Sequence, residues 1–524
     1  IMEISILFLP LIASIISGFF GKYIGDRNSE IVTSALVSIS ALLSVFVLYQ
    51  VIVNQYEENI VIATWINSGS LDVNWSMLID PLSAVMLVVV TSVSSLVHVY
   101  SIGYMSHDPH KPRFMAYLSL FTFAMLMLVT SDNFIQLFFG WEGVGLCSYF
   151  LIGFWFKKES ANTAAIKAFV VNRVGDFGFA LGIFLIFYLF GTVNYSEVFQ
   201  QIPTITDKNL LFLGFEVKAI DLICLFLFIG AMGKSAQILL HTWLPDAMEG
   251  PTPVSALIHA ATMVAAGVFM MVRFFSAVGT ETLDSIWGPD VIAWIGAITS
   301  LLAALMATQQ DDIKKILAYS TLSQLGYMVM AVGLLDPEAG MFHLFTHAWF
   351  KALLFLGSGA VIFACHHEQN IWKMGGLKKT MPVTFLTFGI GTIALCGVPG
   401  TSGFFSKEHI LESAAHSGQW ALFGIAALVA CLTTFYMFRL FFVAFLGNPR
   451  SDSAQHAKEV GPLMSAPLIA LALMAIFSGY QFLGGNISPL YKPFEFHPDA
   501  PAFIASISKD SAVSVTGYQV GFDR

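Results

Sequence analysis

The most constraining feature of this sequence is its succession of long apolar runs. Many of them exceed the roughly 18–20 residues that an α-helix needs to cross the hydrocarbon core of a membrane. The chain is 56% hydrophobic and only 11% charged, whereas soluble domains carry about 25% charged residues. The sequence therefore predicts an all-α polytopic membrane protein. We expect a lipid bilayer around it and, because it lacks a basic face, no binding to nucleic acid.

Polar breaks divide the apolar runs into about fourteen predicted spans. They lie near residues 4–22, 31–53, 80–104, 113–131, 133–155, 164–191, 219–243, 252–275, 290–308, 314–335, 340–363, 380–416, 419–446 and 462–484. We group them into an N-terminal region (1–112), a first repeat (113–275), a second repeat (290–446), and a last span with a polar tail (447–524). Residues 60–79 alternate around Gly69-Ser70, which predicts a hairpin outside the membrane.

Loop charges predict how the spans are oriented. Every second loop is rich in Lys and Arg, and the loops between them are poor in both, with Lys208 and Lys218 as the main exceptions. The positive-inside rule then places the basic loops on the inner side and both termini on the outer side. The basic loops contain Lys22, Arg27, Lys111, Arg113, Lys157, Lys158, Lys314, Lys315, Lys373, Lys378, Lys379, Arg450 and Lys458.

The cysteines give no sign of a metal or cofactor site. All five are scattered singly among apolar residues, without the spacing of a zinc or iron–sulfur site. The run Cys365-His366-His367 offers metal-binding side chains but is more typical of a span end. We therefore expect neither a cofactor nor a metal on this chain, and any redox chemistry on other subunits.

Glu142 is the first ionisable residue that lies where lipid should be. A charge at the bilayer centre costs at least about 2.5–3.5 kcal/mol, so it requires a partner or a water-lined cavity. Glu142 lies mid-span between Gly140 and Gly145, which allow neighbouring helices or water to approach closely. It is a candidate proton carrier. The alternative is a carboxyl group that burial keeps neutral and that has no role in transport.

Lys234 is the second such residue. Burial disfavours its charge and a nearby carboxylate favours it, so a lysine held between the two effects can gain and lose a proton. The alternative is a structural partner for Glu142. Gln237 and His241 follow at i+3 and i+7, and this spacing places them on the same helix face as supporting groups.

A stripe of three titratable residues follows in a later span. His343, His347 and Lys351 occur at i, i+4 and i+8, and histidine near its ordinary pKa is a natural proton relay. Successive members lie about 6 Å apart along a helix, so we expect water to bridge them. The stripe should face the bundle interior. His259, in a neighbouring span, is a single further candidate.

A second lysine lies beside a break in a span. Lys407, followed by Glu408, comes shortly after a run of Pro and Gly residues, and a similar break follows Lys234. The two breaks fall in the seventh and twelfth spans, and an offset of five spans implies repeats of inverted orientation. Arg173 and Asp176, at i and i+3, can pair within one helix, either as part of the transport site or as a structural pair.

Three long motifs resemble the antiporter-like membrane subunits of respiratory complex I, and the resemblance extends from about residue 4 to residue 485. The motifs are Gly140-Trp141-Glu142-Gly143 with Cys147-Ser148-Tyr149, the run from Gly233-Lys234-Ser235-Ala236-Gln237 to Leu257-Ile258-His259, and His343-Leu344-Phe345-Thr346-His347-Ala348-Trp349-Phe350-Lys351-Ala352.

The resemblance implies a fold and an activity. The fold consists of two inverted five-helix units, spans four to eight and nine to thirteen, with discontinuous seventh and twelfth spans. The activity is proton pumping in a bacterial or mitochondrial inner membrane, as part of a proton-translocating NADH:quinone oxidoreductase. FMN, iron–sulfur clusters and quinone are then expected on partner subunits, among them an adjacent antiporter-like subunit. By motif, the proton-carrying residues are Glu142, Lys234, His259, His343, His347, Lys351 and Lys407, supported by Asp176, Arg173, Gln237, His241 and Glu408.

Several alternatives stay open at this stage. A cation/proton antiporter subunit of the Mrp type, without a redox partner, is the rival function, and bicarbonate-uptake and membrane-hydrogenase subunits share these motifs. The residues do not decide between protons and sodium ions, or which end of the polar axis opens outward. Family members continue through a further span, a long lateral helix and an anchoring span, so relative to them we expect the chain to be truncated.

Overall fold

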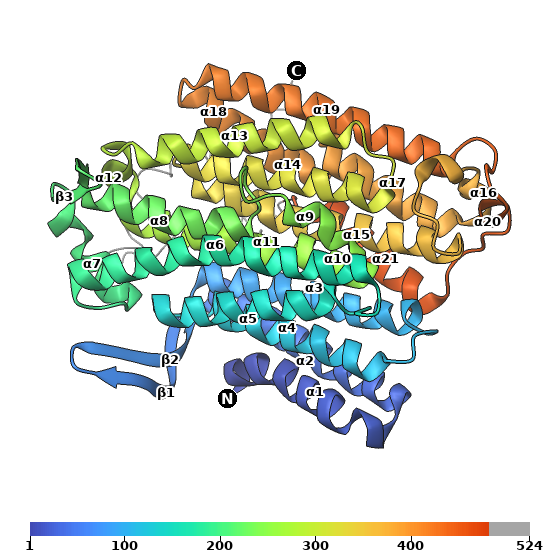
Figure 1. Cartoon of the computed structure of the whole chain (residues 1–524), viewed down its shortest axis with the longest axis horizontal. Helices are drawn as coiled ribbons and strands as arrows, with labels where there is room; N and C mark the ends of the chain where they lie inside the picture. The colour runs from blue at the N-terminus through green and yellow to red at the C-terminus, as the bar shows by residue number, and fades with distance from the viewer. Residues whose placement is uncertain (481–524) are drawn as a thin grey trace.

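The structure is a computed structural model, in which residues 1–480 are described; the predicted polar tail, which follows residue 484, lies outside them. Helices run side by side along one direction and form most of the molecule (Figure 1). Among the described residues, eleven helical segments are long and apolar enough to cross a membrane. They are α1 (Met2–Ile24), α2 (Asp26–Asn54), α3 (Pro81–Tyr104), α4 (Lys111–Val129), α5 (Phe134–Ile152), α6 (Glu159–Phe190), α10 with α11 (Thr252–Ala260 and Met263–Val278), α13 (Gly288–Ala307), α14 (Ile313–Gly333), α15 (Pro337–Ala364) and α19 (Trp420–Phe445).

Shorter elements complete the bundle. The apolar ones are α8 (Ala219–Lys234), α17 (Pro382–Cys396) and α21 (Pro462–Phe477), and α18 (Ser402–His416) follows α17. The connecting ones are α7 (Tyr195–Ile205), α9 (Trp243–Asp246), η1 (Ala247–Glu249), α12 (Thr280–Asp284), η2 (Ile371–Lys373), α16 (Leu377–Thr380) and α20 (Asp452–Gln455). The prediction of an all-helical polytopic membrane protein is thereby confirmed in its general form.

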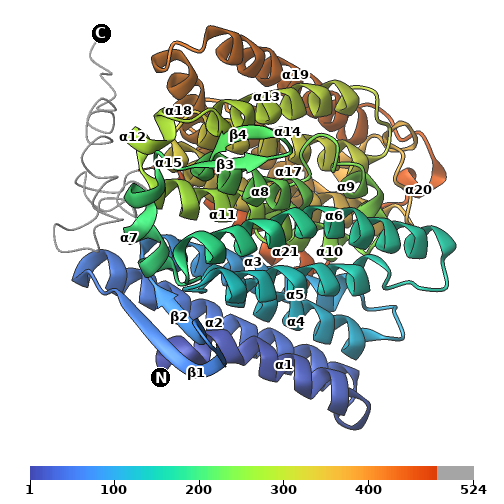
Figure 2. The same ribbon diagram turned by 60° about the vertical axis from the view of Figure 1, so that its left-hand side comes forward.

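Two antiparallel hairpins lie outside the helices. The predicted one is formed by β1 (Glu58–Ser68) and β2 (Leu71–Ile79), and Ser68 pairs with Leu71, which leaves Gly69-Ser70 as the turn. Gly69 has a φ of 63°, a conformation that favours glycine in such turns. A second hairpin, β3 (Asn209–Phe212) with β4 (Phe215–Lys218), was not predicted. Figure 2, in which the left-hand side of Figure 1 comes forward, shows both hairpins in front of the helices.

The elements in the predicted outer loops and those in the predicted inner loops lie at opposite ends of the bundle. In Figure 1 the hairpins, α7 and α12 lie at the left end, and α16 and α20 lie at the right end. Two predicted inner-side loops meet at the right end, where Asp312 and Asn370 form a backbone bridge. Lys378 and Lys379 lie on α16 at the same end. We therefore take the right end as the inner side.

Three helices are interrupted inside the bundle. Helix α8 ends at Lys234, and the residues after it follow an irregular path with positive φ at Ala236 and Leu239. Helix α17 ends at Cys396, and α18 begins only at Ser402. The break after α17 was predicted from Pro and Gly, whereas α8 ends at Lys234, ahead of Pro245, where the sequence placed its break. A third, between α10 and α11 at Ala261-Thr262, was not predicted.

Glycines bring α6 and α8 into contact at this level. A Cβ on Gly175 of α6 would lie 3.0 Å from the Cα of Gly233 and 3.1 Å from the carbonyl oxygen of Ile229, both on α8. Such close backbone packing through small residues is how membrane helices associate without a hydrophobic driving force. The contact fixes Lys234, the neighbour of Gly233, against α6.

Gly403→Ala should prevent normal folding of the α17–α18 break. A Cβ at this position would collide with the carbonyl group of Ala394, which is backbone, and would lie 3.3 Å from the Phe350 ring. Overpacking typically costs about 1–3 kcal/mol, and a backbone collision leaves less room to relax. We expect at least a fivefold lower yield of monodisperse protein after detergent extraction. Gly424→Ala on α19, where a Cβ meets nothing within 4 Å, is the matched control; equal yields of the two variants would contradict the prediction.

Candidate functional site

Four charged residues from three helices form the first part of the site, which we call the charge cluster. Glu142 lies on α5, Arg173 and Asp176 lie on α6, and Lys234 is the last residue of α8. Arg173 Nη1 lies 2.7 Å from Glu142 Oε2, and Lys234 Nζ lies 3.8 Å from Asp176 Oδ2. Two negative and two positive groups therefore neutralise one another within the cluster.

The pairing in the charge cluster differs from the one that the sequence predicted. The i, i+3 spacing suggested a pair between Arg173 and Asp176, and Glu142 was expected to be the direct partner of Lys234. In the structure, each residue of α6 pairs across to a different neighbour, Arg173 to α5 and Asp176 to α8. The reason is that α6 packs against both helices, so residues one turn apart face different partners.

The two pairs have different surroundings. The side chains of Lys234 and Asp176 are 0% and 5% exposed, whereas those of Glu142 and Arg173 are 23% and 51% exposed. The Trp141 indole donates a hydrogen bond of 2.7 Å to Asp176 Oδ1, and its ring lies 5.9 Å from Lys234 Nζ. The cluster thus has an enclosed inner pair and an outer pair that reaches the surface of this chain.

Gly145 makes room for the Lys234 ammonium group. A Cβ at Gly145 would lie 2.8 Å from Lys234 Nζ. Lys234 also lies at the carboxyl end of α8, where the helix dipole favours a positive charge. The missing side chain on α5, the dipole of α8 and the carboxylate of Asp176 together define the position of this buried charge.

Gln237 and His241 do not share a helix face with Lys234. The helix ends at Lys234, and the irregular segment that follows turns both residues away from the predicted alignment. Gln237 is buried and donates to the carbonyl oxygen of Ser235, whereas His241 lies near Thr299 in a small apolar pocket. The i+3 and i+7 spacing was misleading because it assumed an unbroken helix.

The second part of the site is the set of buried histidines between α10 and α15. His259 lies in the last turn of α10, one residue before its end, and its ring stacks on Phe355 with centroids 5.3 Å apart. His347 contacts the backbone of Ala260, the residue after His259. The two histidines are therefore neighbours although they belong to different helices.

His343, His347 and Lys351 face the bundle interior, as predicted. His343 contacts Gln324 Oε1 at 2.8 Å and Ser406 Oγ at 2.9 Å, and its ring centroid lies 6.1 Å from that of His347. That separation is too long for a direct hydrogen bond. Lys351 donates to the hydroxyl group of Ser320 on α14.

The apolar residues of α15 are buried as well. Phe345, Phe350 and Leu353 are 5%, 0% and 0% exposed, so they pack against protein and not against lipid. Helix α15 consequently lies at the centre of the bundle with neighbours on all sides. Its polar residues are reached only through other helices.

Lys407, on α18, completes the series. Its ammonium group donates a 2.7 Å hydrogen bond to the carbonyl oxygen of Leu395, near the end of α17, and lies 5.6 Å from the centre of the Tyr327 ring. The preceding residue, Ser406, contacts His343, so α18 and α15 meet directly beside Lys407. Within the described part of the chain, Glu408 forms no ion pair with Lys407 and is only half-buried.

Buried polar atoms without a protein partner gather along this series. Both ring nitrogens of His259, Nε2 of His347, Nε2 of Gln324, Oε1 of Gln237 and Oγ of Ser255 are enclosed and accept or donate no hydrogen bond within residues 1–480. Buried polar groups are nearly always satisfied, and water is the usual partner where protein supplies none. The arrangement can therefore hold waters that connect the lysines and histidines.

Sequence reasoning missed a buried ion pair near the outer side. Arg273 of α11 contacts both carboxylate oxygens of Asp80, the N-cap of α3, and both side chains are about 5% exposed. The sequence feature that indicates this pair is Arg273, a single arginine within an apolar run. Glu57 lies nearby, and its burial and the Asp80 charge raise its pKa to about 7.

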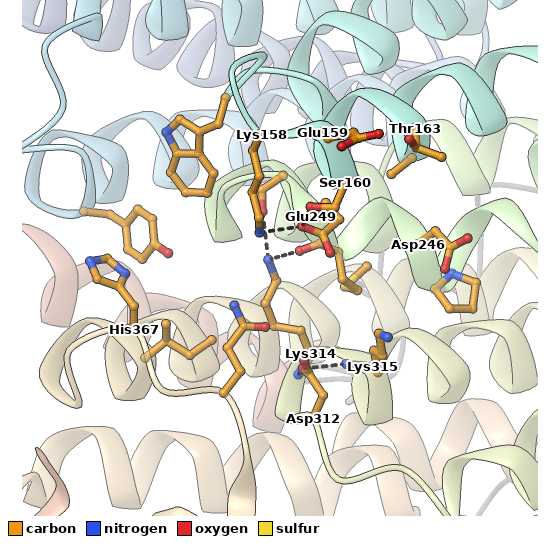
Figure 3. A pocket seen from close by; sticks show the side chains of 18 residues that line it. Lys158, Glu159, Ser160, Thr163, Asp246, Glu249, Asp312, Lys314, Lys315 and His367 are labelled. Atoms are coloured by element: carbon orange, nitrogen blue, oxygen red, sulfur yellow. Dashed lines mark hydrogen bonds and ion pairs between the residues drawn. The ribbon is translucent and has the colours of Figure 1, made fainter.

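A polar cavity of about 760 Å³ lies at the inner end, between the start of α6, the η1 turn and the start of α14 (Figure 3). Lys158 Nζ lies 2.6 Å from Glu249 Oε2, which also accepts from Ser160 Oγ at 3.0 Å. Burial alone would raise the pKa of Glu249, but these bonds hold it below its ordinary value. Lys314 had been assigned to a loop, but its side chain is buried here.

The described residues contain no group of three or more His, Cys, Asp or Glu side chains placed to hold a metal ion. Cys365 is the C-cap of α15, so the Cys365-His366-His367 run stands at the end of a span.

Two family models match the chain. One, described as "NADH:quinone oxidoreductase/Mrp antiporter, TM", covers residues 131–433. The other, described as "NADH-Ubiquinone oxidoreductase (complex I), chain 5 N-terminus", covers residues 65–115. Together they include every residue of the charge cluster, the histidines of α10 and α15, and Lys407.

Curated relatives and solved structures agree with these matches. NADH-ubiquinone oxidoreductase chain 5 of Chondrus crispus is 49% identical over 91% of this chain and 73% of its own length. NADH-quinone oxidoreductase subunit L of Rickettsia bellii is 49% identical over 95% of this chain and 77% of its own length. A chain of the Mrp complex from a Dietzia species superposes with a TM-score of 0.81 at 25% identity, covering 97% of this chain and 55% of that chain. A chain of an archaeal membrane-bound sulfane sulfur reductase has the same fold, with a TM-score of 0.78 at 21% identity over 90% of this chain and 74% of that chain.

Proposed function

Because the chain belongs to the NADH:quinone oxidoreductase/Mrp antiporter membrane family, we propose that its buried Glu, Lys and His residues form one proton path through the bilayer. The chain is a proton-translocating membrane subunit of respiratory complex I, and a multi-pass protein of the inner membrane. Other complex I subunits are its partners. The redox groups, FMN, iron–sulfur clusters and quinone, belong to those partners in this proposal, and one partner is an adjacent antiporter-like subunit.

The proposed architecture has fourteen spans in two inverted five-helix repeats. Its support is the common position of two lysines at helix breaks. Lys234 ends α8, and the ammonium group of Lys407 binds a carbonyl oxygen near the end of α17. In both cases a positive charge lies at the carboxyl end of a half-helix, where the helix dipole is negative. The same device in the seventh and twelfth predicted spans is what inverted repeats would produce.

The proposed path connects these lysines through the histidines. A proton leaves Lys234, passes over His259 and His347, continues to His343, and reaches Lys407. The single observation that carries the proposal is the row of unpartnered buried atoms along this route, because atoms of this kind require water and water conducts protons. Lys351, bonded to Ser320, supplies a further titratable group beside His347.

The charge cluster is the proposed switch of the path. Asp176 supports the proton on Lys234 at 3.8 Å, while Arg173 is held by Glu142. If the charge of Glu142 is moved or neutralised, Arg173 is released and can pair with Asp176, one turn further along α6. Asp176 then no longer stabilises the Lys234 charge, and Lys234 gives up its proton.

The size of this effect is sufficient. Two unit charges about 4 Å apart interact with roughly 4 kcal/mol at an effective dielectric constant near 20. Every 1.4 kcal/mol is tenfold in an equilibrium constant, so the loss of one partner changes the proton affinity of Lys234 by roughly a thousandfold. The exposure of Glu142 and Arg173 leaves the outer pair accessible to a neighbouring subunit.

The rival function, an Mrp-type antiporter subunit without a redox partner, has weaker support. The chain is 49% identical to complex I subunits and 25% identical to the Mrp chain, of which it covers 55%. The shared fold is common to both functions and does not favour the antiporter.

Glu142→Gln should impair pumping in the assembled complex, because glutamine keeps the size and hydrogen bonding of the side chain but removes the charge that holds Arg173. We expect at least a fivefold lower rate of proton uptake into reconstituted vesicles, with NADH oxidation by an artificial electron acceptor unchanged. Glu142→Asp should be milder. Glu197→Gln makes the same chemical change on the exposed face of α7 and is the control. If Glu142→Gln and the control pump alike, Glu142 is a buried neutral acid and the switch is wrong.

A further inference from the structure

The proposed path does not use Lys314, a lysine of the cavity at the inner end. Lys314 lies at the wall of the cavity that faces the bundle interior. Lys314 is 2% exposed, although Lys158 and Lys315 line the same cavity. Figure 3 shows Lys158 and Lys314 extending from opposite sides toward Glu249. Lys314 therefore separates the open part of the cavity from the bundle interior.

Lys314 is bound to the chain just before α10. Its ammonium group donates to the carbonyl oxygens of Met248 at 2.7 Å and Gly250 at 2.8 Å. These two carbonyl groups end the η1 turn, which follows the break after α8. No carboxylate lies within ion-pairing distance of Lys314 among the described residues, so two neutral acceptors hold a buried cation. Such a cation is poised to lose its proton when its surroundings change.

A row of polar side chains continues along α10 from the Lys314 contact toward the bundle interior. Thr252, Ser255 and His259 occur at i, i+3 and i+7, which places them on one helix face. Thr252 bonds the hydroxyl group of Tyr104, and Tyr104 lines the cavity. The hydroxyl group of Ser255 and both ring nitrogens of His259 are buried without a protein partner.

The distances suit a short water chain. Seven residues of helix separate Thr252 from His259, about 10 Å at 1.5 Å per residue. On the other wall, Ser320 follows Lys314 by six residues on α14, about 9 Å, and Ser320 binds Lys351. Helices α10 and α14 therefore both begin at the cavity, and polar residues continue from it along each of them.

We propose that this cavity is the inner-side entrance for protons, and that Lys314 takes up each proton and passes it along Thr252 and Ser255 to His259. In this step Lys314 releases one proton toward Thr252 and binds another from the aqueous phase on the inner side. The Lys158–Glu249 pair forms the charged rim of the entrance. The inference rests on the proposed path and supplies it with protons from the inner side at His259, the residue that follows Lys234 on that path.

A static clamp is the competing role for Lys314, because its two bonds also fix the η1 turn. Arginine distinguishes the two roles. It can donate to the same carbonyl groups and keeps the charge, but it does not release its proton in a protein. A clamp therefore tolerates Lys314→Arg, and a proton carrier does not.

The first experiment compares Lys314→Arg and Lys314→Met with Lys157→Met, an exposed lysine of the same end, in the purified complex. For both Lys314 variants we expect at least a tenfold lower rate of proton uptake into vesicles and normal NADH oxidation by an artificial acceptor. The Lys157 variant should pump normally. If Lys314→Arg assembles and pumps like the wild type, Lys314 is only a clamp and the proposal is overturned.

The second experiment tests the route without changing Lys314. Ser255→Cys should react with a small hydrophilic thiol reagent added from the inner side at least ten times faster than Ala256→Cys, which is equally buried on another face. Labelling of the wild-type chain measures the background reaction of its five native cysteines. Equal rates for the two variants, or labelling from the outer side alone, would overturn the entrance, whether or not Lys314→Arg assembles.

The two experiments also separate this inference from the proposed path. If Lys234 and His259 variants lose pumping while Lys314→Arg and Ser255→Cys behave as their controls do, the path stands and its entrance lies elsewhere. If the Lys234 variants pump normally, the path itself fails, whatever Ser255 shows.

Discussion

Lys234→Ala is expected to stop proton pumping by the assembled complex. Lys234 is the only cation beside Asp176 in the enclosed half of the charge cluster, and the proposed switch acts through the proton that it releases. We expect the rate of proton uptake to fall by at least tenfold, and quinone reduction to slow with it where coupling is tight. Lys208→Ala, at an exposed lysine outside the bundle, is the control.

The main complication is structural. Removing Lys234 leaves Asp176 as an unpaired buried charge, and breaking a buried pair in this way typically costs about 3–5 kcal/mol. Lys234→Met combined with Asp176→Asn removes both charges and restores the balance. The double variant should assemble in normal amounts and still fail to pump. A normal proton-to-electron ratio in either assembled variant would show that Lys234 does not carry the proton.

Replacing His343 and His347 together by alanine should have the second largest effect. Their rings are 6.1 Å apart, and they occupy consecutive turns of α15 between His259 and Lys407. One missing histidine leaves a gap that a water molecule can span, so each single variant should lose only part of the pumping rate. The double variant leaves a gap of about two turns and should lose at least tenfold.

The measurement is again proton uptake at matched amounts of assembled complex. His366→Ala, an exposed histidine just beyond the end of α15, is the control for loss of an imidazole group. Additive effects of the two single changes, or a double variant that pumps like the wild type, would rule out the stripe as an obligatory part of the path.

Much of the fold could be predicted from the sequence because hydrophobic length determines where a chain crosses a membrane. The long apolar runs gave the helices, and the alternation around Gly69-Ser70 gave the first hairpin. The break between α10 and α11 was missed because no Pro or Gly marks it. There the Thr262 hydroxyl group bonds the Leu257 carbonyl oxygen, and such local bonds leave little trace in a sequence.

The site residues could be found as charges in apolar runs, but their partners could not. Arg173 and Asp176 were identified correctly as neighbours on α6, yet which side chain each one meets depends on how α5 and α8 pack against that helix. The sequence places Lys314 in a basic loop because it stands, with Lys315, at the predicted start of a span. Its burial depends on the η1 turn, which comes from a distant part of the chain.

The central position of α15 has a consequence for how the protein is made. Helices of membrane proteins leave the translocation machinery one after another, and each needs a lipid-facing surface to enter the bilayer alone. Helix α15 has almost none, because its sides are covered by other helices, and it carries two histidines and a lysine. One partner of His343, Ser406, belongs to α18, which is synthesised about sixty residues later. Helix α15 must therefore be sheltered, against α14 or by the insertion machinery, until the helices that enclose it have been made.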